Sequence, residues 1–225
     1  MFKQMSNFRH GVIAVLHKEF LTEIREFHSI ATILLLIAIL VVLTAFCFGE
    51  KIADTEALSA VFWLNIYFVS SLSQLRTFTK EFDGGTLFFL RSIVRADSIY
   101  IGKFLFNSLL ACLSNILLAV LFLAVLYSGT ITSFAPLLAG IVAASIAISS
   151  VMTTISVMLS SASGRGSLMP VLAFPLLLPV LYIGISFTKE CLGGNDAFSE
   201  IMFLLAYSGV IISASAVLID YVWDD

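Results

Sequence analysis

Histidine is the residue of this chain whose chemistry most directly suggests a metal or haem site, and its spacing argues against one. His10, His17 and His28 fall on one stripe of a predicted helix. A helical rise of 1.5 Å per residue separates them by roughly 10 Å and 16 Å along the axis. The three rings therefore cannot share one metal ion, and polar residues at a membrane interface are the simpler interpretation.

Cysteine chemistry is equally limited. The three cysteines, Cys47, Cys112 and Cys191, form neither a CxxC pair nor any metal-ligand spacing. Cys47 and Cys191 could both lie near the same face of the molecule. Either a disulfide between them or two inert thiols fits the sequence.

The sequence predicts no nucleotide-hydrolysing site. A phosphate-binding loop needs the pattern GxxxxGK[ST], whose backbone amides cradle phosphate. The best candidate, Gly102-Lys103, has Asp97 in place of the first glycine and Phe104 after the lysine. No HExxH or GxSxG motif occurs either. We therefore expect a protein that is not an enzyme and that binds no cofactor directly.

One polar stretch, FTKEFDGGTLFFL at 78–90, has residue types suited to recognition. Its double glycine supplies a turn geometry closed to most residues, and a threonine after it can cap a short helix. The residues concerned are Glu81, Phe82, Asp83, Gly84, Gly85, Thr86 and Leu87. Such a segment could be held by a partner protein, or it could be a solvated loop with an amphipathic turn facing lipid.

The elements that carry these residues are membrane helices. The chain is 60% hydrophobic and only 12% charged, against about 25% charged in soluble domains. A hydrocarbon core of ~30 Å needs ~20 apolar residues per helix. Six segments qualify: 29–48, 57–75, 104–127, 131–159, 168–187 and 201–219. We expect an all-α polytopic protein with one transmembrane domain, 29–225, preceded by an interfacial segment, 1–28.

The distribution of basic residues predicts the orientation of the chain. Ten of the 12 lysines and arginines lie in 1–28, in the loop 76–103 and at Arg165. The other side has only Lys51 and Lys189. The positive-inside rule therefore places both termini and the loop 76–103 in the cytoplasm.

The N-terminal segment has the pattern of a helix that lies on the membrane. Five apolar side chains fall within an arc of about 80° at 100° per residue: Ile13, Leu16, Phe20, Ile24 and Phe27. The opposite face carries Lys18, Thr22, Arg25 and Glu26. Contact with the membrane surface and docking on a soluble partner both fit this pattern.

Charged residues and histidines inside membrane spans usually mark proton relays and ion-coupled transport. The predicted spans contain none near their centres. Their polar exceptions, Asn65, Gln74, Asn107 and Asn115, could bond neighbouring helices or contact a substrate. The energy for any transport would then come from elsewhere.

The fifth span carries three prolines, Pro170, Pro175 and Pro179. Each lacks a backbone N–H, so we expect a kinked helix inside the bundle. The kink could serve packing alone or line a substrate-facing surface.

Five motifs together resemble the CcmB family, the membrane subunit of the cytochrome c maturation ABC transporter. They are HKEFLTEIRE at 17–26, EFDGGTLFFL at 81–90, IYIGKFLFN at 99–107, SASGRGSLMPVLAFPLLLPVLYIG at 161–184 and VLIDYVWDD at 217–225. They occur in order from residue 17 to the end of the chain.

The resemblance implies an ABC-2 exporter-like fold with six spans, in the bacterial inner membrane. It implies an entrance helix with Glu19, Glu23 and Arg25 at the positions of the family's KE-x-x-x-E-x-R motif. It also implies that the loop 76–103, which we call the coupling loop, contacts a separate ATPase subunit.

The resemblance also implies partners. Family members work with a tryptophan-rich, haem-handling membrane protein and a small single-span protein, and the subunit is expected to be a homodimer in the complex. ATP hydrolysis there drives release of a haem-loaded periplasmic chaperone. No nucleic acid is expected among the partners.

The sequence itself argues against haem binding by this chain. Only Trp63 and Trp223 are present, and no histidine is expected on the outer side. The span residues that could ligate haem are more simply core filler: Met152, Met158, Met169, Tyr182 and Met202. Two other functions stay open, a permease for another cargo such as a lipid-linked sugar or drug, and a membrane scaffold without an ATPase.

Overall fold

The structure, a computed structural model, describes residues 2–25, 27–48, 54–83, 96–127, 129, 134–159 and 165–223. Over these residues it consists of seven helices, with no β-strand. The helices are α1 (Phe2–Arg25), α2 (Phe27–Phe48), α3 (Thr55–Asp83), α5 (Ala96–Leu126), α6 (Phe134–Met158), α7 (Arg165–Gly193) and α8 (Phe198–Trp223). The all-helical prediction is confirmed for this part of the chain.

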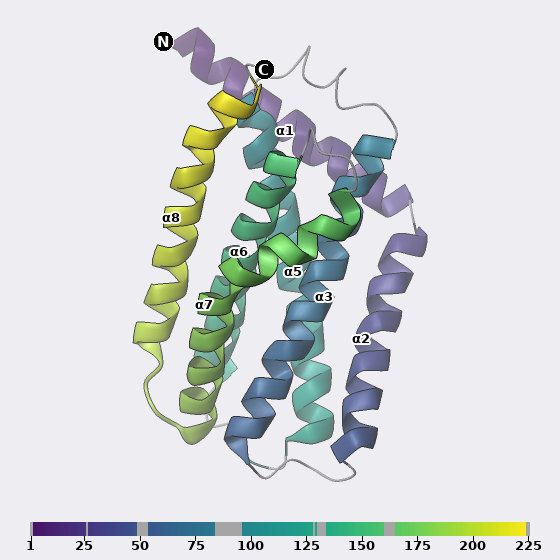
Figure 1. Ribbon diagram of the computed structural model, residues 1–225, viewed down its shortest axis with the longest axis vertical. Helices are drawn as coiled ribbons and strands as arrows, with labels where there is room; N and C mark the ends of the chain where they lie inside the picture. Colours follow the sequence, from purple (N-terminus) through teal and green to yellow (C-terminus); the bar gives the residue numbers. More distant parts are fainter. Residues whose placement is uncertain are drawn as a thin grey trace.

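Six of the helices stand side by side as a bundle, and α1 lies across one end of it (Figure 1). We call this the α1 end. The ends of α1 and α8 that carry the chain termini both lie there (Figure 1). The first residues of α3 and the last residues of α7 lie at the opposite end.

Five of the helices, rather than the six expected, are long and apolar enough to span a membrane. They cover His28–Phe48, Asp97–Leu126, Phe134–Ser156, Leu168–Gly193 and Phe198–Leu218. The exception is α3, which has 29 residues and is therefore long enough, but carries too many polar side chains. The sixth span is thus not established by apolar composition.

Polar side chains between Ser59 and Gln74 of α3 face the interior of the bundle. This helix packs against α2, α5, α6 and α7. Its buried polar residues are Ser59, Asn65, Ser70, Ser71, Ser73 and Gln74. Because its neighbours shield these groups on several sides, α3 can stand in the bundle without being the apolar run that hydropathy detects.

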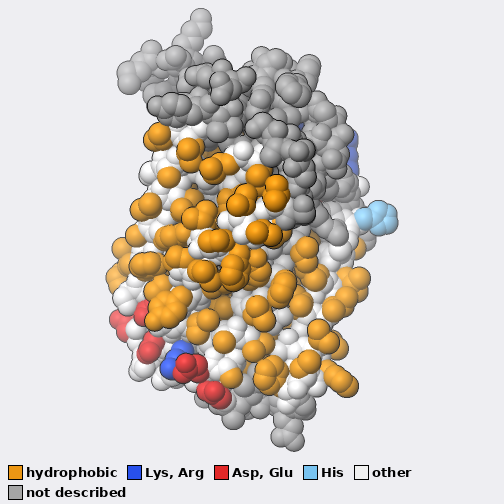
Figure 2. All heavy atoms as spheres, in the orientation of Figure 1, with side chains coloured by type: hydrophobic (Ala, Val, Ile, Leu, Met, Phe, Trp, Pro, Cys, Tyr) orange, Lys and Arg blue, Asp and Glu red, His pale blue; other side chains and the backbone are white. Residues whose placement is uncertain are grey.

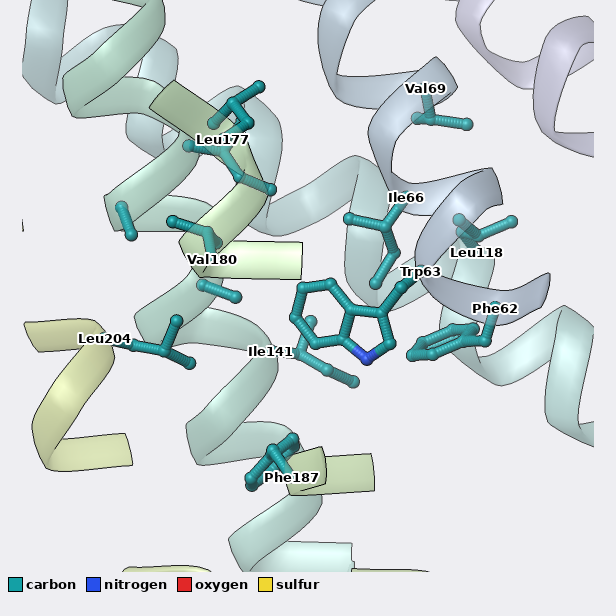
Figure 3. Packing of buried hydrophobic residues seen from close by; sticks show 14 of the residues in the cluster. Phe62, Trp63, Ile66, Val69, Leu118, Ile141, Leu177, Val180, Phe187 and Leu204 are labelled. Carbon is teal, nitrogen blue, oxygen red and sulfur yellow. The ribbon is translucent and has the colours of Figure 1, made fainter. Parts of the chain in front are cut away.

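Aromatic side chains fill the core between α3, α5, α6 and α7. Figure 3 shows the Trp63 indole beside Phe62, with Ile141 and Phe187 below them. The indole Nε1 donates a 2.8 Å hydrogen bond to Thr188 Oγ1. A side chain at Gly184 would place its Cβ 2.3 Å from the indole ring of Trp63, so this glycine makes room for the tryptophan.

Apolar side chains also cover much of the outer surface (Figure 2). They include Val42, Phe46, Val171, Val210 and Val217, each at least 62% exposed. In this view one group of acidic and basic side chains lies toward the opposite end (Figure 2). An apolar belt of this kind is what a hydrocarbon environment requires.

The helix α7 contains all three prolines, and it changes direction along its length. Figure 1 shows its first half running obliquely before the second half turns along the bundle axis. Prolines inside a helix remove backbone hydrogen bonds and cause such bends.

The packing of α7 differs from the expectation of a helix inside the bundle. Ala173, Leu177 and Val180 are fully buried, whereas Val171 is 68% and Tyr182 75% exposed. The bent helix therefore packs on the bundle by one face and leaves its other face open within this chain.

Candidate functional site

A close contact between two helices lies where α1 crosses the first turns of α5. Val15, which is 1% exposed, sits against Gly102 of α5. A Cβ at position 102 would lie 2.8 Å from both Cβ and Cγ1 of Val15. The two helices can approach this closely because residue 102 has no side chain.

A buried ion pair holds the same contact. Lys103 Nζ lies 3.4 Å from Glu19 Oε1, and the two side chains are only 4% and 6% exposed. The half-exposed Lys18 places its own Nζ 3.3 Å from the same oxygen. Removing two charges from water is costly, so such a pair is better suited to fixing a geometry than to adding stability.

Further contacts continue along both helices. Ser98 Oγ donates a 3.4 Å hydrogen bond to the carbonyl oxygen of Phe8. Near the other end of the contact, the rings of Phe20 and Phe106 meet edge to face, with centroids 6.0 Å apart. The start of α5 is therefore held by α1 from residue 98 to residue 106.

The buried and exposed side chains of α1 differ from those that the amphipathic pattern predicted. Val15, Glu19 and Glu23 are spaced by four, share one face of the helix and are buried. Ile13 and Ile24 are 61% and 59% exposed. The charged side of this contact was missed because its partner, Lys103, is 84 positions from Glu19 in the sequence (103 − 19).

The entrance-helix residues thus have two different environments. Glu19 and Glu23 are buried at 5% and 8% exposure, whereas Arg25 is exposed at the end of α1. Two features of the sequence could have identified this contact. One is the spacing of four between Val15, Glu19 and Glu23, and the other is the adjacent pair Gly102-Lys103.

The predicted coupling loop, 76–103, is partly helical. The backbone of α3 continues to Asp83 and that of α5 begins at Ala96. Glu81, Phe82 and Asp83 therefore form the last turn of α3. The remaining residues predicted for this site, Gly84, Gly85, Thr86 and Leu87, lie outside the described residues.

A polar seam of interhelical hydrogen bonds continues from this region into the bundle. Asn115 Nδ2 donates to Ser70 Oγ at 3.1 Å and to Ser145 Oγ at 3.0 Å. The other bonds of the seam run from Gln74 Nε2 to Ser149 Oγ at 3.2 Å and from Asn107 Nδ2 to Thr153 Oγ1 at 3.3 Å. The seam joins α3, α5 and α6.

The four amide side chains singled out in the predicted spans all bond a neighbouring helix. Asn65 Nδ2 reaches Thr44 Oγ1 of α2 at 3.4 Å, and the other three belong to the polar seam. Helix-to-helix bonding, one of the two readings left open above, is therefore confirmed.

The groups considered for metal, haem or redox chemistry do not assemble into one site. No three His, Cys, Asp or Glu side chains of the described residues could hold a metal ion together. Cys47, Cys112 and Cys191 are all free thiols. Met152 and Met169 are buried, whereas Met158, Tyr182 and Met202 are at least 50% exposed.

Comparison with known proteins identifies the family. No curated protein sequence matches this chain. The family model described as CcmB protein matches residues 10–220, a range that includes α1 from residue 10 onward, the polar seam and the prolines of α7. Because this match covers nearly the whole sequence, the chain belongs to the CcmB family.

Proposed function

We propose that this chain is the membrane subunit of an ABC transporter complex for cytochrome c biogenesis in the bacterial inner membrane. Membership of the CcmB family and five helices able to span a membrane support this role. ATP is bound and hydrolysed on a separate ATPase subunit. A haem-handling membrane protein, a small single-span protein and a second copy of this chain complete the complex.

The observation that carries the proposed mechanism is the buried Glu19–Lys103 contact between α1 and α5. The ATPase binds the coupling loop through Glu81, Phe82, Asp83 and the residues that follow. A displacement of that loop reaches the start of α5 directly, because α5 begins at Ala96. It reaches α1 as well, because the ion pair and the Val15–Gly102 contact tie the two helices together.

In this proposal α1 lies on the cytoplasmic surface of the membrane. Its buried face points to α5, and the exposed Ile13, Phe20 and Ile24 enter the lipid interface. Such a helix converts a movement of α5 into a movement relative to the bilayer. Both chain termini are then cytoplasmic, in agreement with the distribution of basic residues.

The chain transmits force and does not carry haem. Its span methionines are either core side chains, as Met152 and Met169 are, or surface side chains on α6 and α8. Haem ligation needs a positioned axial ligand, and the span residues of suitable type are divided between the core and the outer surface of the described bundle. Haem stays on the partner proteins, and the outer surface of this chain acts on them.

A paired substitution at the end of α3 tests the ATPase contact. Phe82→Ala with Asp83→Lys removes an aromatic anchor and reverses a charge, the two kinds of change that most weaken an interface. We expect the variant to insert into the membrane normally, to lose co-purification of the ATPase and to lose cytochrome c maturation.

The matched control makes the same kinds of change at the opposite end of the bundle. Phe46→Ala with Glu56→Lys alters two exposed side chains. This variant should retain the ATPase. Unchanged co-purification and maturation in the Phe82/Asp83 variant would contradict the assignment.

Haem binding is tested on the purified chain alone. We expect addition of haem to give no saturable, stoichiometric shift of the Soret band. A saturable shift that disappears on replacement of Met152, Met169 or Tyr182 would overturn the force-transmission mechanism.

A further inference from the structure

Two rows of small or polar side chains face each other in the polar seam. Along each helix the members are spaced by four, so each row occupies one face. The rows are Asn115, Ala111 and Asn107 on α5 and Ser145, Ser149 and Thr153 on α6. The two helices run in opposite directions, because α5 starts at the α1 end and α6 finishes there (Figure 1). Hydrogen bonds at both ends pair the rows in order, so Ala111 falls opposite Ser149.

The levels of these rows differ in what α5 contributes. At the first level both ends of the Asn115 amide are bonded, since Nδ2 donates to a serine of α6 and Oδ1 accepts from Ser70 Oγ at 3.2 Å. At the middle level α5 contributes only the methyl group of Ala111, which is 0% exposed. Gln74 of α3, one turn beyond Ser70, crosses to Ser149 at this level. The methyl group leaves more room there than an amide side chain would.

Two amide oxygens of the seam have no protein partner among the described residues. They are Gln74 Oε1 and Asn107 Oδ1, and both side chains are 0% exposed. Their nitrogens bond Ser149 and Thr153, which are one helical turn apart, about 6 Å along the axis of α6. An unpaired buried oxygen is costly, and buried polar groups of native proteins are generally bonded to protein or to ordered water. The two oxygens therefore indicate a ligand between them.

The chemistry of the site favours water as that ligand. Two acceptor oxygens require a donor, and a water molecule carries two O–H groups. The hydroxyls of Ser71 and Ser108, which are buried and bond no described group, are polar groups next to these amides in the sequence. A sodium or potassium ion matches less well, because the seam holds no carboxylate to balance its charge. A side-chain amide can also exchange its oxygen and nitrogen by rotation, and only water suits both arrangements.

We propose that the middle of the polar seam is an internal water-binding site, where water molecules bridge Gln74 Oε1 and Asn107 Oδ1 beside Ala111. The level of Asn115 is dry, because its amide is already bonded by protein groups. The bridge joins α3 to α5 at a height where each of these amides bonds α6. This inference concerns the interior of one chain and does not depend on the proposed function.

An electron cryo-microscopy map of the complete complex, at a resolution that shows ordered water, tests the proposal directly. We expect density within hydrogen-bonding distance of Gln74 Oε1 and Asn107 Oδ1, and none of this kind beside Asn115 Oδ1. The Asn115 amide is the internal control, since it belongs to the same seam. A map in which protein groups bond both oxygens, or in which the space between them is empty, would overturn the proposal.

A substitution at Ala111 tests whether the space is wet or dry. Ala111→Val should lower the thermal unfolding midpoint of the complex, because it displaces water and leaves buried oxygens unpaired. In a dry space the added methyl groups would raise the midpoint by filling a void. Ala119→Val is the control on the same helix, since Ala119 lines an apolar groove of about 340 Å³ between α5 and α6. Its midpoint should not fall. A rise for Ala111→Val, or equal falls for both variants, would contradict the proposal.

The choice of water over a cation is tested with salts. The unfolding midpoint of the unaltered complex is compared in sodium chloride, potassium chloride and choline chloride at equal ionic strength. We expect equal midpoints, because water occupies the site in all three. A rise in sodium or potassium chloride that Asn107→Leu abolishes would identify a monovalent cation as the ligand and overturn the assignment to water.

Discussion

The ion pairs at the two ends of the bundle differ in solvent exposure. At the α1 end, Glu19 and Lys103 are 6% and 4% exposed and lie 3.4 Å apart. At the opposite end, Lys189 and Glu56 lie closer, at 2.9 Å, but remain 47% and 69% exposed. The shorter pair is the less consequential one, because water solvates both of its charges whether or not they meet.

This difference indicates where the molecule depends on a single geometry. A buried pair that loses one partner leaves a charge in a poorly solvated place. An exposed pair that loses one partner leaves an ordinary surface charge. The buried pair therefore fixes the position of α1 against α5, whereas the opposite end tolerates the loss of one partner of its ion pair.

The largest expected effect comes from breaking the buried pair. Glu19→Ala should lower the free energy of unfolding by about 3–5 kcal/mol, since it removes one partner of a buried ion pair. Glu56→Ala, the matched change at the opposite end, should alter stability too little to resolve. Unfolding titrations in mixed micelles measure both, and equal losses for the two variants would contradict the comparison.

A smaller effect is expected from crowding the α1–α5 contact. Gly102→Ala should cost about 1–3 kcal/mol, because its Cβ would overlap Val15. Gly209→Ala in α8 is the control, since no atom lies within 4 Å of a Cβ there, and it should stabilise the helix by about 0.5–1 kcal/mol. Combining Gly102→Ala with Val15→Ala should recover part of the loss. Absence of any recovery would show that the cost does not arise at this contact.

The smallest effect is expected inside the polar seam. Asn115→Ala removes the hydrogen bonds to two serines of neighbouring helices, Ser70 and Ser145, and should cost about 1 kcal/mol, within the range measured for such bonds in membrane proteins. Asn65→Ala should cost less, because the shorter bond of its amide, at 2.8 Å, goes to Val61 of its own helix. The same unfolding titration ranks the two variants, and the reverse order would contradict this reading of the seam.

Much of the fold follows from sequence, because apolar length and proline placement act locally. The apolar segments predicted at 29–48 and 201–219 correspond to α2 and α8, and three prolines indicated where α7 bends. The helix α3 shows the limit of hydropathy. Its polar side chains are shielded by neighbours that no local window contains.

The candidate site was predictable only in part. A resemblance to family motifs singled out Glu19 and Glu23, but the amphipathic pattern gave no reason for them to be buried. That reason is a tertiary contact with Gly102 and Lys103, which depends on how α1 crosses α5. Periodicity reports the faces of one helix and carries no information about the partner of each face.

The central claim is that the Glu19–Lys103 pair couples α1 and α5 during ATP-driven work. The most direct measurement is the ATPase activity and cytochrome c maturation of complexes carrying Glu19→Lys, Lys103→Glu or both changes, at matched membrane levels. Each single variant places like charges together, so both readouts should fall severalfold, whereas the double variant restores opposite charges and should recover a substantial part of each. Single variants with full activity, or a double variant worse than either single one, would contradict the account.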